Sequence, residues 1–136
     1  MNVIIDTNLW ISFLIGKRLS VLKSLLTNPD LTIFVCGKLL EEIQYISSKQ
    51  KIRKYVGNDD IRDTLVLIDR FCKFVVIQQD AISPVRDIED LYLLSLADTV
   101  RADYIITGDK DLLILHTHNQ TKIVTYNDFA EIVGKQ

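Results

Sequence analysis

The chain has 136 residues, of which 48% are hydrophobic and 25% are charged. This length buries an ordinary core without disulfide or metal staples, and the apolar content excludes an intrinsically disordered chain. The formal net charge is -2, so no overall basic field marks a nucleic-acid-binding protein, and a polyanion would need a local basic patch. We therefore expect a single globular domain over residues 1–136.

The cysteine pattern and the N-terminus indicate a cellular compartment. Cys36 and Cys72 lie beside apolar segments and have no cysteine or histidine near them in the sequence. Two isolated cysteines do not form a disulfide framework, so we expect buried free thiols in a reducing environment. The N-terminus lacks the charged and apolar regions of a signal peptide, and no apolar run approaches the roughly 18 residues of a membrane span. The sequence therefore predicts a cytoplasmic protein.

The predicted elements alternate between strands and helices along the chain. Residues 3–5 are a β-branched run typical of a strand buried on both faces, and a polar turn at 6–8 follows it. Further strands are predicted over residues 31–36, 74–77, 104–106 and 123–124. The spacing of apolar residues predicts helices over residues 19–26, 37–47, 58–72, 88–100, 109–115 and 127–133. This alternation indicates an α/β domain with a mainly parallel sheet.

Acidic residues fall at the predicted strand ends or in the first turns of nearby helices: Asp6, Glu42, Asp87, Asp90, Asp109 and Asp111. In a parallel sheet these places open onto one edge. Carboxylates gathered at that edge repel each other, which raises their pKa values unless a cation is present. A hard divalent ion, Mg²⁺ or Mn²⁺, favours such oxygen ligands. The expected chemistry is metal-assisted phosphodiester hydrolysis, which needs no protein nucleophile.

Each of these acidic residues also has a purely structural interpretation. Asp6 and Asp109 are placed to cap the helices that follow them, and Glu42 taken alone reads as a solvated helix residue. Asp87 and Asp90 have the spacing of an N-cap and the third residue of a helix. Singly, each structural interpretation stays open. As a set, the carboxylates favour a site, because their separate roles would otherwise meet at one edge by coincidence.

Other chemistries have weaker support in the sequence. His116 and His118 lie in a polar loop, and we expect both to be surface residues. No cysteine or third histidine is near enough in sequence to complete a metal site with them, and no glycine-rich phosphate loop is present. Trp10 and Phe13 lie in an apolar run, so we expect them to form core or dimer contacts rather than to stack on RNA.

The densest basic cluster comprises Lys49, Lys51, Arg53 and Lys54, with Tyr55 beside it. It follows the predicted helix that carries Glu42. One interpretation is an RNA-binding flank of the site, in which the cations meet phosphates and the tyrosine stacks on a base. The other is an ordinary solvated helix end, and the sequence does not decide between them.

Four motifs in this order resemble the PIN-domain family: IIDTN at 4–8, LLEEI at 39–43, RDIEDLYLLSLA at 86–97 and ADYIITGDKDLL at 102–113. The resemblance covers nearly the whole chain, and the last motif is the most specific. It is closest to the small single-domain PIN proteins that act as the toxin of a toxin–antitoxin pair.

The resemblance places the four acidic positions of the family on Asp6, Glu42, Asp90 and Asp109. Glu42 is preferred to Glu41 because the glutamate of the family directly precedes an aliphatic residue, as Glu42 does here. Four further positions are implied as supporting groups: Asn8, Thr107, Asp111 and Asp87.

The resemblance implies a three-layer α/β/α sandwich with a mainly parallel sheet of about five strands. It also implies an endoribonuclease that depends on one or two Mg²⁺ or Mn²⁺ ions, is inhibited by a cognate antitoxin, and often forms a homodimer. Two other functions stay open. One is a receiver-like signalling domain phosphorylated on Asp6 or Asp109, and the other is a catalytically silent PIN-like module that binds RNA or protein.

Overall fold

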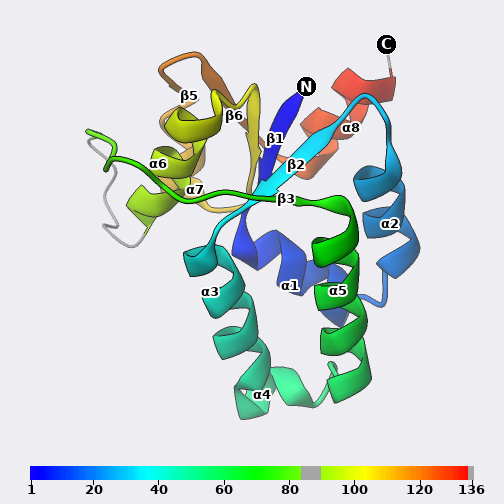
Figure 1. Ribbon diagram of the computed structural model, residues 1–136. Coiled ribbons are helices and arrows are strands. Elements are labelled where there is room, and N and C mark those ends of the chain that lie inside the picture. The colour runs from blue at the N-terminus through cyan, green and yellow to red at the C-terminus, as the bar shows by residue number, and fades with distance from the viewer. Residues whose placement is uncertain (84–89, 135–136) are drawn as a thin grey trace.

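A computed structural model describes residues 1–83 and 90–134 of the chain (Figure 1). The strands are β1 (Asn2–Ile5), β2 (Thr32–Val35), β3 (Lys73–Phe74), β4 (Tyr104–Ile106), β5 (Thr117–His118) and β6 (Thr121–Val124). The helices are α1 (Thr7–Ile15), α2 (Leu19–Thr27), α3 (Gly37–Ser48), α4 (Gln50–Arg53), α5 (Asn58–Phe71), α6 (Leu91–Val100), α7 (Lys110–Leu113) and α8 (Tyr126–Gly134). These elements form the predicted mixed α/β fold.

The strands make one six-stranded sheet in the order β3-β2-β1-β4-β6-β5. All neighbours are parallel except β5 and β6, which form an antiparallel hairpin. In the centre of the sheet, Ile5 of β1 lies opposite Ile106 of β4. Strands β1 and β4 therefore end side by side. The Asp6 amide, just after β1, donates to the Ile106 carbonyl at the end of β4, at 2.9 Å. This register fixes which residues meet at the carboxyl edge of the sheet.

Helices cover both faces of the sheet. In Figure 1, α1, α3 and α5 form one group, while α6 and α7 lie together on another side of the sheet. Helix α6 contacts β1 and β4, and α1 contacts α2 and α3. Helix α8 joins the layer of α1, because Tyr126 meets Phe13 edge to face with ring centroids 5.5 Å apart. The result is the expected α/β/α arrangement.

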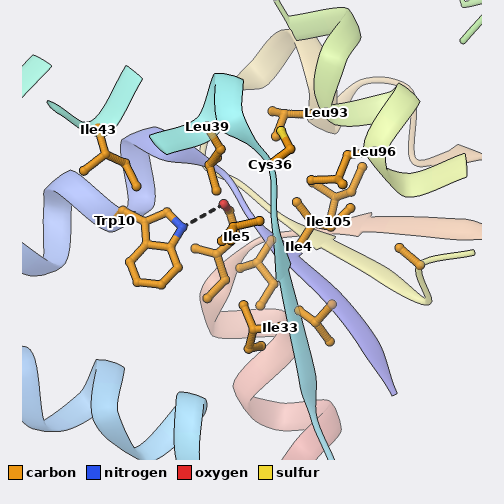
Figure 2. Packing of buried hydrophobic residues seen from close by; sticks show 14 of the residues in the cluster. Ile4, Ile5, Trp10, Ile33, Cys36, Leu39, Ile43, Leu93, Leu96 and Ile105 are labelled. Atoms are coloured by element: carbon orange, nitrogen blue, oxygen red, sulfur yellow. Dashed lines mark hydrogen bonds between the residues drawn. The ribbon is translucent and has the colours of Figure 1, made fainter. Parts of the chain in front are cut away.

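The core is centred on β1 and on α1, the helix that follows it (Figure 2). Ile4, Ile5 and Ile105 are fully buried, which is why the central strands are continuous apolar runs without polar alternation. Trp10 is also fully buried, and its indole Nε1 donates to the Ile5 carbonyl at 3.0 Å. This bond connects the first turn of α1 to the end of β1. It therefore fixes the position of Asp6, the single residue between the two elements.

The structure corrects several predicted bounds. The strand predicted over residues 74–77 is the two-residue β3, because only the Val75 amide continues the pairing beyond it, donating to Val35. A sixth strand, β5, was missed since a two-residue strand has no measurable periodicity. Residues 88 and 89, the predicted start of α6, lie outside the described residues, and α6 begins at Leu91. The four-residue helix α4 was not predicted.

Both cysteines are free, as expected, although only Cys36 is fully buried and Cys72 is half-buried. Burial raises the pKa of both thiols, that of Cys72 to about 12. No helix in the described part of the chain is long and apolar enough to cross a membrane.

Candidate active site

Asp6, Thr107 and Asp109 are linked by hydrogen bonds at the carboxyl edge of the sheet. The Thr107 hydroxyl donates to Asp6 Oδ2 at 2.7 Å and accepts a bond from the Asp109 amide at 3.0 Å. Asp6 is 4% exposed and Thr107 is 1% exposed. The chain reaches this arrangement because Asp6 and Thr107 directly follow the paired strands β1 and β4. Two of the four predicted acidic positions therefore share one threonine.

The Asp6 carboxyl carries an electrostatic cost. Its pKa is raised, first by burial and then by the nearby charge of Asp109. The Thr107 hydroxyl and the amide groups of Thr7 and Asn8 oppose this rise without cancelling it. Desolvation and a like charge both disfavour the ionised form, so a cation beside the pair would relieve both effects.

The capping interpretation does not account for Asp6. Asp6 occupies the N-cap position of α1. The amides of Thr7 and Asn8 lie near enough to its carboxyl to lower its pKa, but neither forms a capping hydrogen bond of normal geometry with it. Its carboxylate instead accepts from Thr107, in the next strand. Asp109 does cap, since its Oδ1 accepts the Asp111 amide at 2.9 Å at the start of α7. The cap engages one oxygen of Asp109, and the like charge of this residue still acts on Asp6.

Glu42 is held by two hydroxyl groups from different helices. The Tyr92 hydroxyl, in the first turn of α6, donates to Glu42 Oε2 at 2.9 Å. The hydroxyl of Thr7, the first residue of α1, donates to the same oxygen at 3.1 Å, and the two hydroxyl oxygens are 3.0 Å apart. Glu42 is half-buried whereas Glu41 is exposed. Of the two glutamates, the one favoured from the sequence is therefore the one that faces this polar contact.

Asp6 and Glu42 belong to one electrostatic environment, and Tyr92 connects them. Burial raises the pKa of Tyr92 well above its usual range, and the charges of Glu42 and Asp6 raise it further. The hydroxyl therefore stays protonated at neutral pH and acts as a donor. Thr7 directly follows Asp6, and its hydroxyl donates to Glu42 in α3, so it links the end of β1 to the same group of polar side chains.

The remaining predicted residues are less closely engaged. Asp90 lies at the N-cap of α6, two residues before Tyr92, and does not cap the helix with its side chain. Asp87 lies outside the described residues. Asn8 is exposed, and within the described ranges its side chain forms no hydrogen bond. It lines a cavity of about 490 Å³ together with Asp109 and Asp111, so these side chains face open space beside the carboxylates.

Oxygen donors of this kind fit a hard divalent cation, and the charge of Asp109 lies close enough to disfavour the ionised form of Asp6. However, within residues 1–83 and 90–134 no three histidine, cysteine or acidic side chains gather closely enough to form a complete metal site. The fit therefore consists of a coupled carboxylate pair, with Glu42 held nearby by Thr7 and Tyr92.

The basic cluster lies away from this edge. Lys49, Lys51, Arg53 and Lys54 are all exposed on and around α4, which follows the far end of α3. At about 1.5 Å per residue, Lys49 is about 10 Å farther along the helix axis than Glu42. The cluster is free to contact a long polyanion, and its RNA-binding role stays a prediction.

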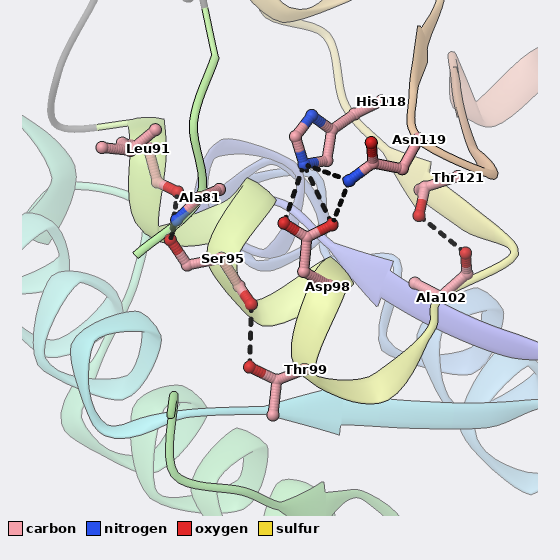
Figure 3. Close-up of polar contacts among 9 residues, drawn as sticks. All are labelled: Ala81, Leu91, Ser95, Asp98, Thr99, Ala102, His118, Asn119 and Thr121. Carbon is pink, nitrogen blue, oxygen red and sulfur yellow. Dashed lines mark hydrogen bonds and ion pairs between the residues drawn. The ribbon is translucent and has the colours of Figure 1, made fainter. Parts of the chain in front are cut away.

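The prediction for His118 was wrong. His118 is only 8% exposed, and its Nε2 lies 3.0 and 3.1 Å from the two oxygens of Asp98 (Figure 3). Asn119 also donates to Asp98, at 2.8 Å. These contacts attach the β5–β6 hairpin to α6, a tertiary contact that the loop sequence did not reveal. His116 is exposed, as expected.

Two residues of the site were not singled out from the sequence. Thr7 was read as part of a turn, and Tyr92 lies within an apolar helical run. The only signal for Tyr92 is a hydroxyl-bearing side chain among the leucines of α6, and that pattern equally fits a partly exposed helix face. Neither assignment could be made without the packing of α1, α3 and α6.

The fold and the site place the chain among α/β domains with a mainly parallel sheet and acidic residues at the carboxyl ends of the central strands. The sequence model of the family described as "PIN domain" matches residues 2–111 of the chain. An uncharacterized protein of Methanocaldococcus jannaschii is 31% identical over 147 aligned positions, which cover 96% of this chain and 90% of that protein. The chain belongs to the PIN-domain family. Proteins of this family are generally nucleases and typically use a divalent metal ion.

Proposed function

We propose that the protein is an endoribonuclease that depends on Mg²⁺ or Mn²⁺. The observation that carries this proposal is the buried Asp6 carboxylate at the carboxyl edge of the sheet. It accepts a hydrogen bond from Thr107, whose hydroxyl also accepts from the Asp109 amide, and it lies within the field of the Asp109 charge. A buried carboxyl with a raised pKa beside a second carboxylate is a costly arrangement that a structural role does not require. Membership in a family of nucleases supports the same reaction class.

Asp6, Glu42, Asp90 and Asp109 are the residues proposed to hold one or two cations. When bound, the cation supplies Lewis-acid polarisation of the phosphodiester and activates water for attack. Neighbouring hydroxyl groups orient the carboxylates that would bind the cation. Thr107 holds the Asp6 carboxylate, and the burial of Asp6 keeps bulk water away from it.

The RNA strand is proposed to enter beside the 490 Å³ cavity at Asn8 and Asp111 and to extend toward the basic cluster on α4. Four exposed cations there supply the phosphate contacts that the acidic edge lacks. Tyr55, which is 56% exposed, is available to stack on an unpaired base.

We also propose that the protein is the toxin of a toxin–antitoxin pair and that the antitoxin covers the apolar face near β3. Phe74 and Val76 are 59% and 65% exposed there, beside a cavity of about 320 Å³ lined by Leu40, Leu65 and Phe74. Exposed apolar surface of this kind marks a protein interface. A homodimer through the same face is the competing occupant, and size-exclusion chromatography of the isolated protein tests it.

The nuclease proposal is tested by incubating end-labelled single-stranded RNA and DNA of the same sequence with the protein, with Mg²⁺, Mn²⁺ or EDTA. We expect internal cleavage of RNA, abolished by EDTA and reduced at least about a hundredfold by Asp6→Asn or Asp109→Asn. Asp63→Asn, an exposed change on α5, is the matched control. Binding without cleavage would support a silent module, and equal cleavage by Asp6→Asn would show that the assignment of the active site to Asp6 is wrong.

The toxin proposal has its own experiment. Expression of the wild-type chain should arrest bacterial growth, whereas the Asp6→Asn chain should not. Co-expression of the small protein encoded by the neighbouring reading frame should restore growth and co-purify with the nuclease. Growth arrest by both chains alike would contradict the toxin role without bearing on RNA cleavage in vitro.

A further inference from the structure

Tyr92 places a hydroxyl group between helices α1, α3 and α6, where it meets Glu42 and Thr7. Its distances to Glu42 Oε2 and Thr7 Oγ1 are 2.9 and 3.0 Å. The contact joins residues 7, 42 and 92, which are far apart in the sequence.

The hydroxyl of Tyr92 is not needed for packing. The buried face of α6 is supplied by Leu93, Leu94 and Leu96, and a phenylalanine at position 92 would fill the same ring volume. A hydroxyl in a largely buried position costs desolvation energy unless it finds a partner. Here the partner is the carboxylate of Glu42, so the bond is charge-assisted and stronger than a bond between neutral groups.

Both hydrogen bonds to Glu42 fall on the same oxygen, Oε2. Within the described residues, no hydrogen bond is made to Oε1. Thr7 and Tyr92 therefore each donate one hydroxyl proton to Oε2, and Oε1 stays available to a ligand. This division resembles the way that outer hydrogen bonds orient carboxylates that bind metal ions.

We propose that Tyr92 is a positioning residue that, with Thr7, fixes Glu42 Oε2 and presents Oε1 to the divalent cation of the active site. The proposal rests on the proposed function, since it assigns Tyr92 a role toward the cation of that site. It predicts that the Tyr92 hydroxyl acts only through Glu42.

The first measurement is Mn²⁺ binding to the full chain by calorimetry, in the absence of RNA. Tyr92→Phe keeps the ring and removes the hydroxyl, and we expect it to bind Mn²⁺ about 10- to 100-fold more weakly than wild type. Tyr126→Phe is the control, because Tyr126 contacts Phe13 through its ring. It should bind Mn²⁺ as tightly as wild type, and both variants should show a cooperative thermal transition.

The second measurement is a double-mutant cycle. In a Glu42→Gln background, adding Tyr92→Phe should weaken Mn²⁺ binding by less than about twofold further, because the group through which Tyr92 acts is already changed. In a Glu41→Gln background the loss should keep its full size. A full loss in the Glu42→Gln background would overturn the proposal, since Tyr92 would then act by another route.

The third measurement separates positioning from general damage. RNA cleavage by Tyr92→Phe should be slow at low Mn²⁺ and should recover when Mn²⁺ is raised about 100-fold, whereas a distorted site would not recover. A wild type that binds no Mn²⁺ would overturn both the proposed function and this inference. A wild type that binds Mn²⁺ and cleaves RNA, beside an equally tight Tyr92→Phe, would overturn this inference alone.

Discussion

Replacing Asp6 by asparagine should stabilise the metal-free protein even though it removes activity. Asp6 is 4% exposed, and its pKa is raised by burial and by the charge of Asp109. Because this pKa is raised, the ionised form of the carboxyl is disfavoured in the folded protein relative to the unfolded chain. Asparagine has the same shape, carries no charge, and still accepts the bond from Thr107.

The pH dependence follows from the direction of the shift. Because the folded pKa lies above the unfolded value of about 3.9, the folded state binds this proton more tightly. The associated stability is fully present below pH ~3.9 and is lost as the pH rises through the folded pKa. The advantage of Asp6→Asn should therefore be largest at neutral pH, at about 0.5–2 kcal/mol, the usual gain when a functional compromise is removed. For a chain of this length that is a Tm increase of roughly 2–8 °C.

The assay is urea and thermal unfolding of wild type, Asp6→Asn and the exposed control Asp63→Asn, in EDTA, at neutral pH and below pH ~4. The control should match wild type at both pH values. Mn²⁺ at about 100 times its Kd should then stabilise wild type by about 2.7 kcal/mol and should stabilise Asp6→Asn much less. If Asp6→Asn is less stable than wild type at neutral pH in EDTA, the carboxylate has a net structural role and the reasoning fails.

Three further outcomes follow from the buried contacts. Thr107→Val should destabilise the fold by about 1.5–3 kcal/mol in urea unfolding, because it removes the donor to the Asp6 carboxylate, while Thr107→Ser should retain most of the stability. Trp10→Phe should cost about 2–3 kcal/mol through the lost bond to Ile5 and the space left in the core, and a change under ~0.5 kcal/mol would contradict the packing. Since the pKa of Cys72 is raised to about 12, its alkylation at pH ~8 should be roughly a thousandfold slower than that of a free thiol, and a rate matching glutathione would refute the burial.

The parts of the fold that follow from local pattern were predictable from the sequence. The strand at residues 3–5 has no polar alternation because helices cover both faces of the sheet. Its register with β4 places the residue after each strand at one edge, so Asp6 and Thr107 could be expected to meet. Strand β6 was predicted, but its partner β5 was not, because a two-residue strand has no measurable periodicity. The contact of His118 with Asp98, which joins this hairpin to α6, was not predicted either. The sequence of a short polar loop contains no sign of such a partner.

The candidate site divides in the same way. The half made by Asp6, Thr107 and Asp109 follows from parallel strand pairing, which sequence patterns capture. The half made by Glu42 and Tyr92 depends on how α3 and α6 pack near the start of α1. That geometry is set by long-range side-chain packing, so no spacing rule within the chain anticipates it.

The behaviour of the N-cap aspartates gives the strongest structural argument for function. Asp109 forms the capping hydrogen bond that its position favours, whereas Asp6 occupies an equivalent position and forms none with its side chain. Local rules alone would have both side chains cap their helices. A buried carboxyl that does not cap its helix, and whose pKa is raised, is expected at a functional site rather than at a purely structural helix end. The departure at Asp6, together with Glu42 held through a single oxygen, therefore supports the proposed cation site over a set of separate helix caps.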